Sequence, residues 1–179
     1  MIGWQHLEDN IKCQFPANDP LTALVPCLDG IDPDDAFSTV PYEKGHTFLW
    51  YLEELVGGTE KFHPFLRAYL EKFAFKSLVT SEFRAYFEEY FADQSSKLAE
   101  IDWKTWLNKP GMPDYKPNFD QTLVTACSDL SKKWQDAADS DSMEHTKAAF
   151  EAFSTDQKVY FLDMIYSFET PLAILKVLL

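Results

Sequence analysis

The chain has 179 residues, of which 46% are hydrophobic, and its formal net charge is −13. This composition predicts one or two folded domains and argues against a disordered chain. The negative charge argues against binding to nucleic acid or to an anionic membrane surface. Three scattered cysteines indicate thiols rather than a disulfide framework or a cysteine-based zinc site. No signal peptide or run of ~18 apolar residues is visible, so we expect a soluble, cytoplasmic protein.

Apolar residues recur at helical spacing along most of the chain, which predicts an all-α fold. In the first half, the predicted helices begin near Trp4, Pro41, Glu60, Thr80 and Asp102. The helix that starts at Pro41 follows a proline-rich loop over residues 16–40, and Ser38 or Thr39 is its expected cap. Gly57 and Gly58 are expected to end it.

A second group of helices is predicted after a proline-rich stretch over residues 108–118, which cannot form regular structure. Asp120 is expected to cap one helix, residues 154–157 form a capping-box pattern that opens another, and Thr170 precedes a last one. The apolar pair at 178–179 stops in mid-stripe, so both ends of the chain are expected to be cut. Paired helices of this size suggest the start of an α-solenoid.

The sequence does not predict a metal site or a nucleophile. None of the four histidines has another histidine three or four residues away, as a thermolysin-like zinc site requires; they are His6, His46, His63 and His145. No nucleophile elbow surrounds a serine, and the six glycines form no phosphate-binding loop. We therefore expect no zinc to bind to this chain alone.

Tyr42 is the candidate catalytic residue. It lies in the first turn of a predicted helix, just after an acidic loop that contains Asp32, Asp34 and Asp35. A phenol held there can donate a hydrogen bond to negative charge that develops during a reaction. The alternative is a packed ring with a hydrated hydroxyl, and the aspartates are then a solvated loop before a helix N-terminus.

Several separated segments, in the same order, resemble the zinc aminopeptidase family of leukotriene A4 hydrolase and aminopeptidase B. The similarity covers most of residues 1 to about 135, and is carried by residues 40–45 (Val-Pro-Tyr-Glu-Lys-Gly), 48–58, 65–73, 102–107, 110–113 and 116–120. The resemblance implies that residues 1–107 are the C-terminal helical part of a thermolysin-like catalytic domain. It further implies a linker at 108–119 and, at 120–179, the first helices of an armadillo-like domain.

The resemblance also implies roles for individual residues. Tyr42 matches the family tyrosine that hydrogen-bonds the tetrahedral intermediate formed at zinc. Asp32, Pro33 and Asp34 match the loop that lines the substrate pocket. Phe37 stands where leukotriene hydrolases have a second tyrosine, and it keeps the ring but lacks the donor. Aminopeptidase activity, rather than epoxide hydrolysis, is therefore the implied chemistry.

Two hypotheses about function follow. In the first, the chain is a fragment or short form of a zinc aminopeptidase, which removes N-terminal residues from peptides in the complete enzyme and is inactive alone. The family's His-Glu-x-x-His zinc motif would lie before residue 1, and zinc would be a cofactor of the complete enzyme only. In the second, the chain is a non-catalytic helical scaffold or interaction module derived from the same family. In either case, apolar helix faces left without neighbours predict self-association.

Overall fold

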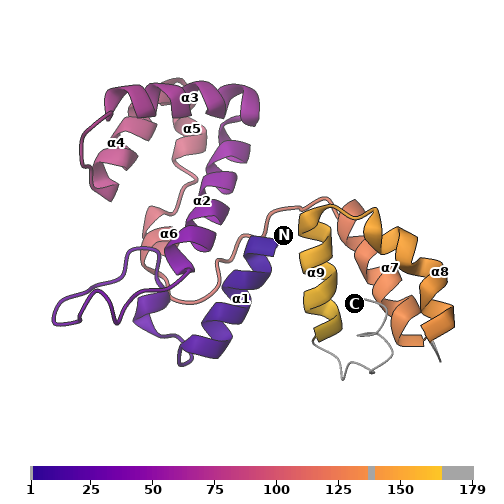
Figure 1. Ribbon diagram of the computed structural model, residues 1–179. Coiled ribbons are helices and arrows are strands. Elements are labelled where there is room, and N and C mark those ends of the chain that lie inside the picture. Colours follow the sequence, from indigo (N-terminus) through magenta and orange to yellow (C-terminus); the bar gives the residue numbers. More distant parts are fainter. Residues whose placement is uncertain (1, 137–139, 167–179) are drawn as a thin grey trace. The chain divides into compact units, whose positions relative to one another are not determined.

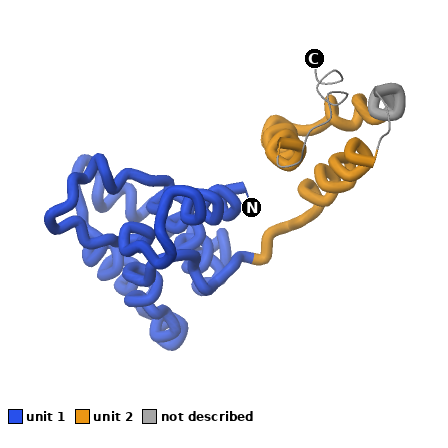
Figure 2. Tube along the Cα trace, turned by 90° about the horizontal axis from the view of Figure 1, so that it is seen from below, with its two compact units in different colours: residues 1–117 blue, residues 118–179 orange. Residues whose placement is uncertain are grey.

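A computed structural model describes residues 2–136 and 140–166 of the chain (Figure 1). The described residues form helices and contain no strand, which confirms the predicted all-α class. They divide into two compact units, Met1–Pro117 and Asn118–Leu179 (Figure 2), and each unit is described by itself.

The first unit contains six α-helices and two short 3₁₀ segments within its described residues. In chain order they are α1 (Ile2–Gln14), η1 (Pro20–Thr22), α2 (Val40–Val56), α3 (Thr59–Lys72), α4 (Thr80–Tyr90), η2 (Ala92–Gln94), α5 (Ser95–Leu98) and α6 (Trp103–Asn108). Helix α2 contacts both α1 and α3, and α3 contacts α4. Helix α2 is therefore the element around which the unit is arranged.

The limits of α2 follow from its sequence. Pro41 lies in the first turn, where the missing N–H of proline costs no helical hydrogen bond. The Ser38 hydroxyl accepts a hydrogen bond from the Val40 N–H at 3.3 Å, whereas the Thr39 side chain makes no capping bond. Gly57 ends the helix with φ of 111°, a left-handed conformation that favours glycine.

The core of this unit is built from aromatic rings. The Phe65 side chain is fully buried, and its ring contacts seven others: Phe62, Tyr69, Phe83, Tyr86, Phe87, Tyr90 and Phe91. Their centroids lie 5.3–6.2 Å from that of Phe65, the range in which aromatic pairs attract one another. The heavy aromatic content of the chain is therefore used to fix α3 against α4.

Some details predicted for these helices are wrong. Leu49 and Leu70 were expected to face the core but are 38% and 66% exposed. Thr80 does not cap α4; instead the Glu82 carboxylate accepts a hydrogen bond from the Val79 N–H at 2.8 Å. Asp102 does cap α6, and its carboxylate accepts from the Thr105 N–H at 3.0 Å.

The second unit contains α7 (Thr122–Asp136), α8 (Ser140–Glu151) and α9 (Thr155–Tyr166). Helix α7 packs on both α8 and α9. The buried core of the second unit consists of Cys127, Leu130, Trp134, Phe161 and Ile165.

Two of the predicted helix starts in this unit are confirmed. The Asp120 carboxylate accepts from the Thr122 N–H at 2.8 Å. Ser154 and Gln157 form the predicted reciprocal pair, at 3.2 and 3.3 Å. Three residues expected to face inward are exposed instead, namely Leu123, Val159 and Leu162. Helix α8 was not predicted, and the helix predicted after Thr170 lies outside the described residues.

Candidate functional site

Tyr42 projects from the outer side of the first turn of α2. Its backbone N–H donates to the Thr39 carbonyl at 3.1 Å, so the residue is part of the helix. The side chain is 66% exposed. Within residues 2–136 and 140–166 its hydroxyl has no hydrogen-bond partner. The phenol is thus open to a group that comes from outside the described part of the chain.

The acidic loop before α2 is a compact turn closed by Asp32. The Asp32 carboxylate accepts from the Asp34 N–H at 3.0 Å, and the Asp32 carbonyl accepts from the N–H groups of Asp35 and Ala36. The aspartates therefore differ in role, since Asp32 holds the turn while the Asp34 carboxylate has no such bond to the turn. Phe37 is 75% exposed at the end of this turn. In Figure 1 the loop projects beyond the N-terminal end of α2.

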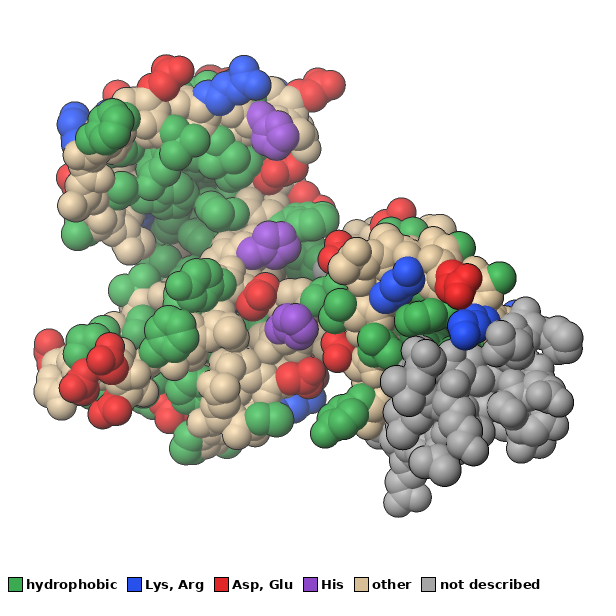
Figure 3. Space-filling model, viewed as in Figure 1, with side chains coloured by type: hydrophobic (Ala, Val, Ile, Leu, Met, Phe, Trp, Pro, Cys, Tyr) green, Lys and Arg blue, Asp and Glu red, His purple; other side chains and the backbone are tan. Residues whose placement is uncertain are grey.

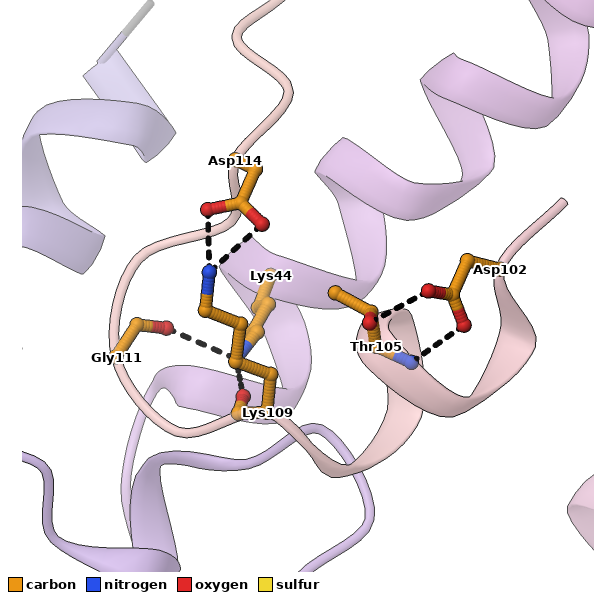
Figure 4. Close-up of polar contacts among 6 residues, drawn as sticks. All are labelled: Lys44, Asp102, Thr105, Lys109, Gly111 and Asp114. Carbon is orange, nitrogen blue, oxygen red and sulfur yellow. Dashed lines mark hydrogen bonds and ion pairs between the residues drawn. The ribbon is translucent and has the colours of Figure 1, made fainter.

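Lys44 lies on the opposite side of the same helix. It belongs to the buried stripe of α2, which consists of Val40, Lys44, Thr47, Phe48, Leu52 and Val56. The Lys44 side chain is only 1% exposed. Its Nζ donates to three backbone carbonyls, those of Thr22 at 3.0 Å, Lys109 at 2.7 Å and Gly111 at 2.9 Å. Figure 4 shows the bonds to Lys109 and Gly111.

Further hydrogen bonds join the segments that Lys44 binds. The Thr22 hydroxyl donates to the Asp19 carbonyl at 2.6 Å and accepts from the Gly111 N–H at 2.8 Å. The Val25 N–H donates to the Leu107 carbonyl at 2.8 Å. We call Lys44, its three carbonyls and the Thr22 hydroxyl the Lys44 clamp. The clamp ties the loop before α2 and the loop after α6 to the N-terminal end of α2.

Burial changes the acid–base properties of Lys44. Desolvation is the main cause that lowers the pKa of Lys44 to about 8, and the positive charge of Lys109 adds to it. The Asp114 carboxylate acts in the opposite direction and raises the pKa. The Lys109 ammonium lies 2.5 Å from Asp114 Oδ1 and 2.7 Å from Oδ2, so this carboxylate is engaged by Lys109 (Figure 4). In the described part of the chain, no carboxylate forms an ion pair with Lys44.

A cavity of about 290 Å³ lies beside the clamp, between α2, α6 and the loop that follows α6. Aromatic rings form its walls, with Tyr51 5.1 Å from Trp106 and 5.2 Å from Tyr115 between centroids. The Tyr115 hydroxyl donates to the Glu54 carboxylate. Burial and this carboxylate raise the pKa of Tyr115. The loop over residues 109–115 is therefore held on the first unit by both polar and aromatic contacts.

A second, more open hollow of about 560 Å³ has an apolar lining contributed by α2, α3, α4 and the loop around Leu24. In Figure 3 hydrophobic side chains gather at this place in the first unit. Val79 and Leu49 on its border are 62% and 38% exposed.

The described residues contain no group of three or more histidine, cysteine, aspartate or glutamate side chains that could hold a metal ion. The side chains present in residues 2–136 and 140–166 therefore do not fit a zinc centre. Within the same residues, no helix is both long and apolar enough to cross a membrane.

Comparison with known proteins assigns the fold and sequence to a class of peptidase. The peptidase family M1 domain matches residues 8–106, which is more than half of the chain. The chain therefore belongs to peptidase family M1, and the predicted relationship to the aminopeptidases of this family is confirmed.

Three relatives show how the match extends. The chain is 48% identical over 139 residues to leukotriene A-4 hydrolase of Xenopus laevis, covering 78% of this chain and 23% of that protein. It is 43% identical over 171 residues to leucine aminopeptidase 2-1 of Meyerozyma guilliermondii, covering 94% of this chain and 28% of that protein. The solved structure of leukotriene A4 hydrolase from Saccharomyces cerevisiae is similar with a TM-score of 0.81 at 38% identity, covering 90% of this chain and 27% of that one. The chain thus spans about a quarter of the length of these relatives.

Sequence reasoning located Tyr42, Asp34, Pro33 and Phe37, and the structure places all four at the exposed surface. It did not assign a role to Lys44. A signal was available, since Lys44 lies midway between Val40 and Phe48 at four-residue spacing, on the apolar stripe of a helix. A lysine on such a stripe lies on the side of the helix that faces the core, although lysines are rarely fully buried.

Proposed function

We propose that this chain supplies part of the substrate side of an M1 aminopeptidase site. Tyr42 donates a hydrogen bond to the oxyanion that forms when water adds to the first peptide carbonyl. The observation that carries the proposal is an exposed phenol in the first turn of α2, without a hydrogen-bond partner among the described residues, in a chain that belongs to this family. A donor aimed at an oxyanion typically contributes about 2.7–4 kcal/mol to transition-state stabilisation.

We further propose that Asp34, with Pro33 and Phe37 beside it, meets the N-terminal amine and first side chain of a peptide. Asp32 keeps its carboxylate on the Asp34 N–H, so Asp34 is the aspartate of this pair that faces a ligand. The exposed Phe37 ring adds an apolar contact without a donor. A bound zinc ion would activate the attacking water, but the described residues contain no cluster to hold one. We propose that the zinc ligands come from other parts of a complete enzyme and that this chain alone is inactive.

The domain organisation stays a proposal as well. Residues 1–107 correspond to the helical end of the catalytic domain, 108–119 to a linker and 120–179 to the first helices of an armadillo-like domain. In support, the first unit has a core of its own, centred on Phe65, and α7 to α9 share a separate core around Trp134. The first part of the proposed linker, residues 109–115, is held on the first unit by hydrogen bonds to Lys44 and by the contact between Tyr51 and Tyr115.

A direct test uses the Saccharomyces cerevisiae leukotriene A4 hydrolase as host. Its matching segment is replaced by this chain, and hydrolysis of a leucyl anilide is measured. We expect an active chimera, and we expect Tyr42→Phe to lower kcat by about 10²–10³-fold. Asp34→Asn should raise KM about tenfold, because the substrate ammonium loses a charged partner.

Tyr166→Phe is the matched control, because Tyr166 is also a highly exposed helical tyrosine, at 89%. Its kcat should equal that of the unmodified chimera. Equal kcat for the Tyr42 and Tyr166 variants would reject the role of Tyr42. Anilide hydrolysis by the 179-residue chain alone would reject the proposed inactivity.

The scaffold hypothesis has one observation in its favour, the apolar hollow bordered by Val79 and Leu49. We propose self-association through this face as the second candidate behaviour of the chain alone. Sedimentation should show a concentration-dependent dimer that Val79→Glu weakens. A monomer at all concentrations would contradict it.

A further inference from the structure

We propose that Lys44 is the positioning residue for Tyr42: through the Lys44 clamp it fixes the first turn of α2 and so the direction in which the phenol points. This inference rests on the proposed function of Tyr42. It assigns a role to a residue that faces away from the reacting groups.

The geometry of the ammonium supports positioning over ligand binding. A lysine ammonium has three N–H donors, and all three of Lys44 are used by the carbonyls of Thr22, Lys109 and Gly111. No donor remains for a ligand in the neighbouring cavity of about 290 Å³. The three carbonyls come from two loops far apart in sequence, so one side chain fixes both loops to the helix.

The place of Lys44 on the helix connects the clamp to Tyr42. Two residues along an α-helix point to nearly opposite sides, since each residue turns the helix by about 100°. Lys44 faces inward at 1% exposure and Tyr42 faces outward at 66%. A rotation or shift of the first turn that moves Lys44 from its carbonyls therefore moves the Tyr42 hydroxyl by a similar amount. A displacement of about 1 Å can reduce a rate ~100-fold.

The chemistry also favours a positional role over a purely stabilising one. A charge buried without a carboxylate partner is costly, so a gain in stability does not by itself account for an ammonium at this position. The ammonium contributes geometry instead, because its three hydrogen bonds define a single position for this turn of the helix. Replacing the Lys44 amine by an apolar group should therefore loosen this turn even where the core remains packed.

The first experiment is amide hydrogen exchange on the full 179-residue chain, comparing Lys44→Met with the unmodified protein. We expect exchange of the Tyr42 and Glu43 amides to accelerate at least ~10-fold, with α4 and α9 unchanged. Lys97→Met is the matched control, because Lys97 is an exposed lysine of the same unit, and should change none of these rates. Uniform acceleration across the unit would overturn the proposal, because it would show a general loss of stability.

The second experiment is a double-mutant cycle in the chimera with leucyl anilide. Lys44→Met should lower kcat by about 10–100-fold with KM nearly unchanged, and should have little effect when Tyr42 is already Phe. An equal loss in both backgrounds would overturn the proposal, since Lys44 would then act on the fold and not through Tyr42. If Tyr42→Phe itself has no effect on kcat, the proposed function fails, while the exchange experiment still decides whether the clamp fixes the turn.

Thr22→Val provides a second variant in case Lys44→Met does not fold. It removes the hydroxyl that accepts from the Gly111 N–H while leaving the Lys44 charge in place. Its effects should have the same sign and location as those of Lys44→Met, but be smaller. Unchanged exchange at Tyr42 in a folded Thr22→Val protein would contradict the clamp.

Discussion

The surface formed by residues 32–45 and the aromatic core around Phe65 use aromatic side chains in opposite ways. In the core, the rings of Phe62, Phe65, Phe87 and Phe91 are buried, and the centroids of the rings that contact Phe65 lie within 6.2 Å of its own. At the surface, Phe37 and Tyr42 are 75% and 66% exposed. The difference indicates that the core rings contribute stability, whereas Phe37 and Tyr42 form no comparable ring packing within the described residues. Substitutions in the core should therefore mainly change the free energy of unfolding, whereas substitutions at the surface should mainly change activity in the chimera.

The largest effect on stability is expected in the core. Phe65→Ala removes a fully buried ring and should lower the free energy of unfolding by about 3–5 kcal/mol. Leu70→Ala on the same helix should change it by less than ~0.5 kcal/mol, because Leu70 is 66% exposed. Denaturant unfolding of the full chain measures both. Similar losses for the two variants would contradict the assignment of the core to the Phe65 cluster.

An intermediate effect is expected for the pH dependence of stability, through Lys44. This residue lies within residues 32–45, but its side chain is buried. Its pKa is about 8 in the folded protein against 10.5 as the ordinary value, with Lys109 and Asp114 as the nearby charges. Between these values the unfolded chain binds more protons, so the free energy of unfolding should rise with pH. The free energy of unfolding is therefore highest above pH 10.5, where Lys44 is neutral in both states. This gain is lost as the pH falls through 8, where Lys44 becomes charged in the folded protein.

The measurement is the difference in unfolding free energy between the unmodified protein and Lys44→Met, followed from pH 7.5 to 10.5. Taking this difference cancels the contribution of the other titrating groups. It should increase by about 1–3 kcal/mol across the range. A flat difference would show that Lys44 titrates near its ordinary value and is more hydrated than the structure indicates.

A smaller effect is expected for the cap of α6, which borders the clamp. The Asp102 carboxylate accepts hydrogen bonds from the backbone and side chain of Thr105, and these bonds lower the pKa of Asp102. Asp102→Ala should lower the melting temperature by a few degrees at pH 7. Because the folded pKa is depressed, the difference should shrink as the pH falls through it. Asp93→Ala, an exposed acidic residue elsewhere, provides the control.

The smallest effect on stability is expected for Tyr42→Phe. The hydroxyl is exposed and makes no bond within the described residues, so the free energy of unfolding should change by less than ~0.5 kcal/mol. The same substitution is expected to have the largest effect on kcat in the chimera. A loss of stability comparable to that of Phe65→Ala would show that Tyr42 is a structural residue.

The sequence predicted helix α2 well because strong local signals mark both ends. Pro41 fits only a first turn, and Gly57 takes a left-handed conformation that other residues avoid. Which side of a helix is covered was less predictable. Leu70 and Leu123 follow the apolar spacing but are exposed, because burial depends on which neighbours are present and not on the helix alone.

The positions of the candidate site residues could be predicted from the sequence, but the hydrogen bonds that hold the surrounding backbone could not. Tyr42 and Asp34 were identified from a motif, and the substrate contacts proposed for them involve a molecule that the sequence does not describe. Lys44 was overlooked because a lysine is normally assumed to be hydrated. Its three partners are backbone carbonyls of Thr22, Lys109 and Gly111, which carry no side-chain signal and come together only in the folded chain.

The role proposed for the Tyr42 hydroxyl is to stabilise the oxyanion of peptide hydrolysis. It can be tested with a peptide phosphonate, whose tetrahedral anionic group mimics that oxyanion, by measuring its affinity for the chimera with Tyr42 and with Tyr42→Phe. We expect Tyr42→Phe to lower phosphonate affinity and kcat/KM by the same factor, about 10²–10³. Phosphonate affinity that is unchanged by Tyr42→Phe would contradict it.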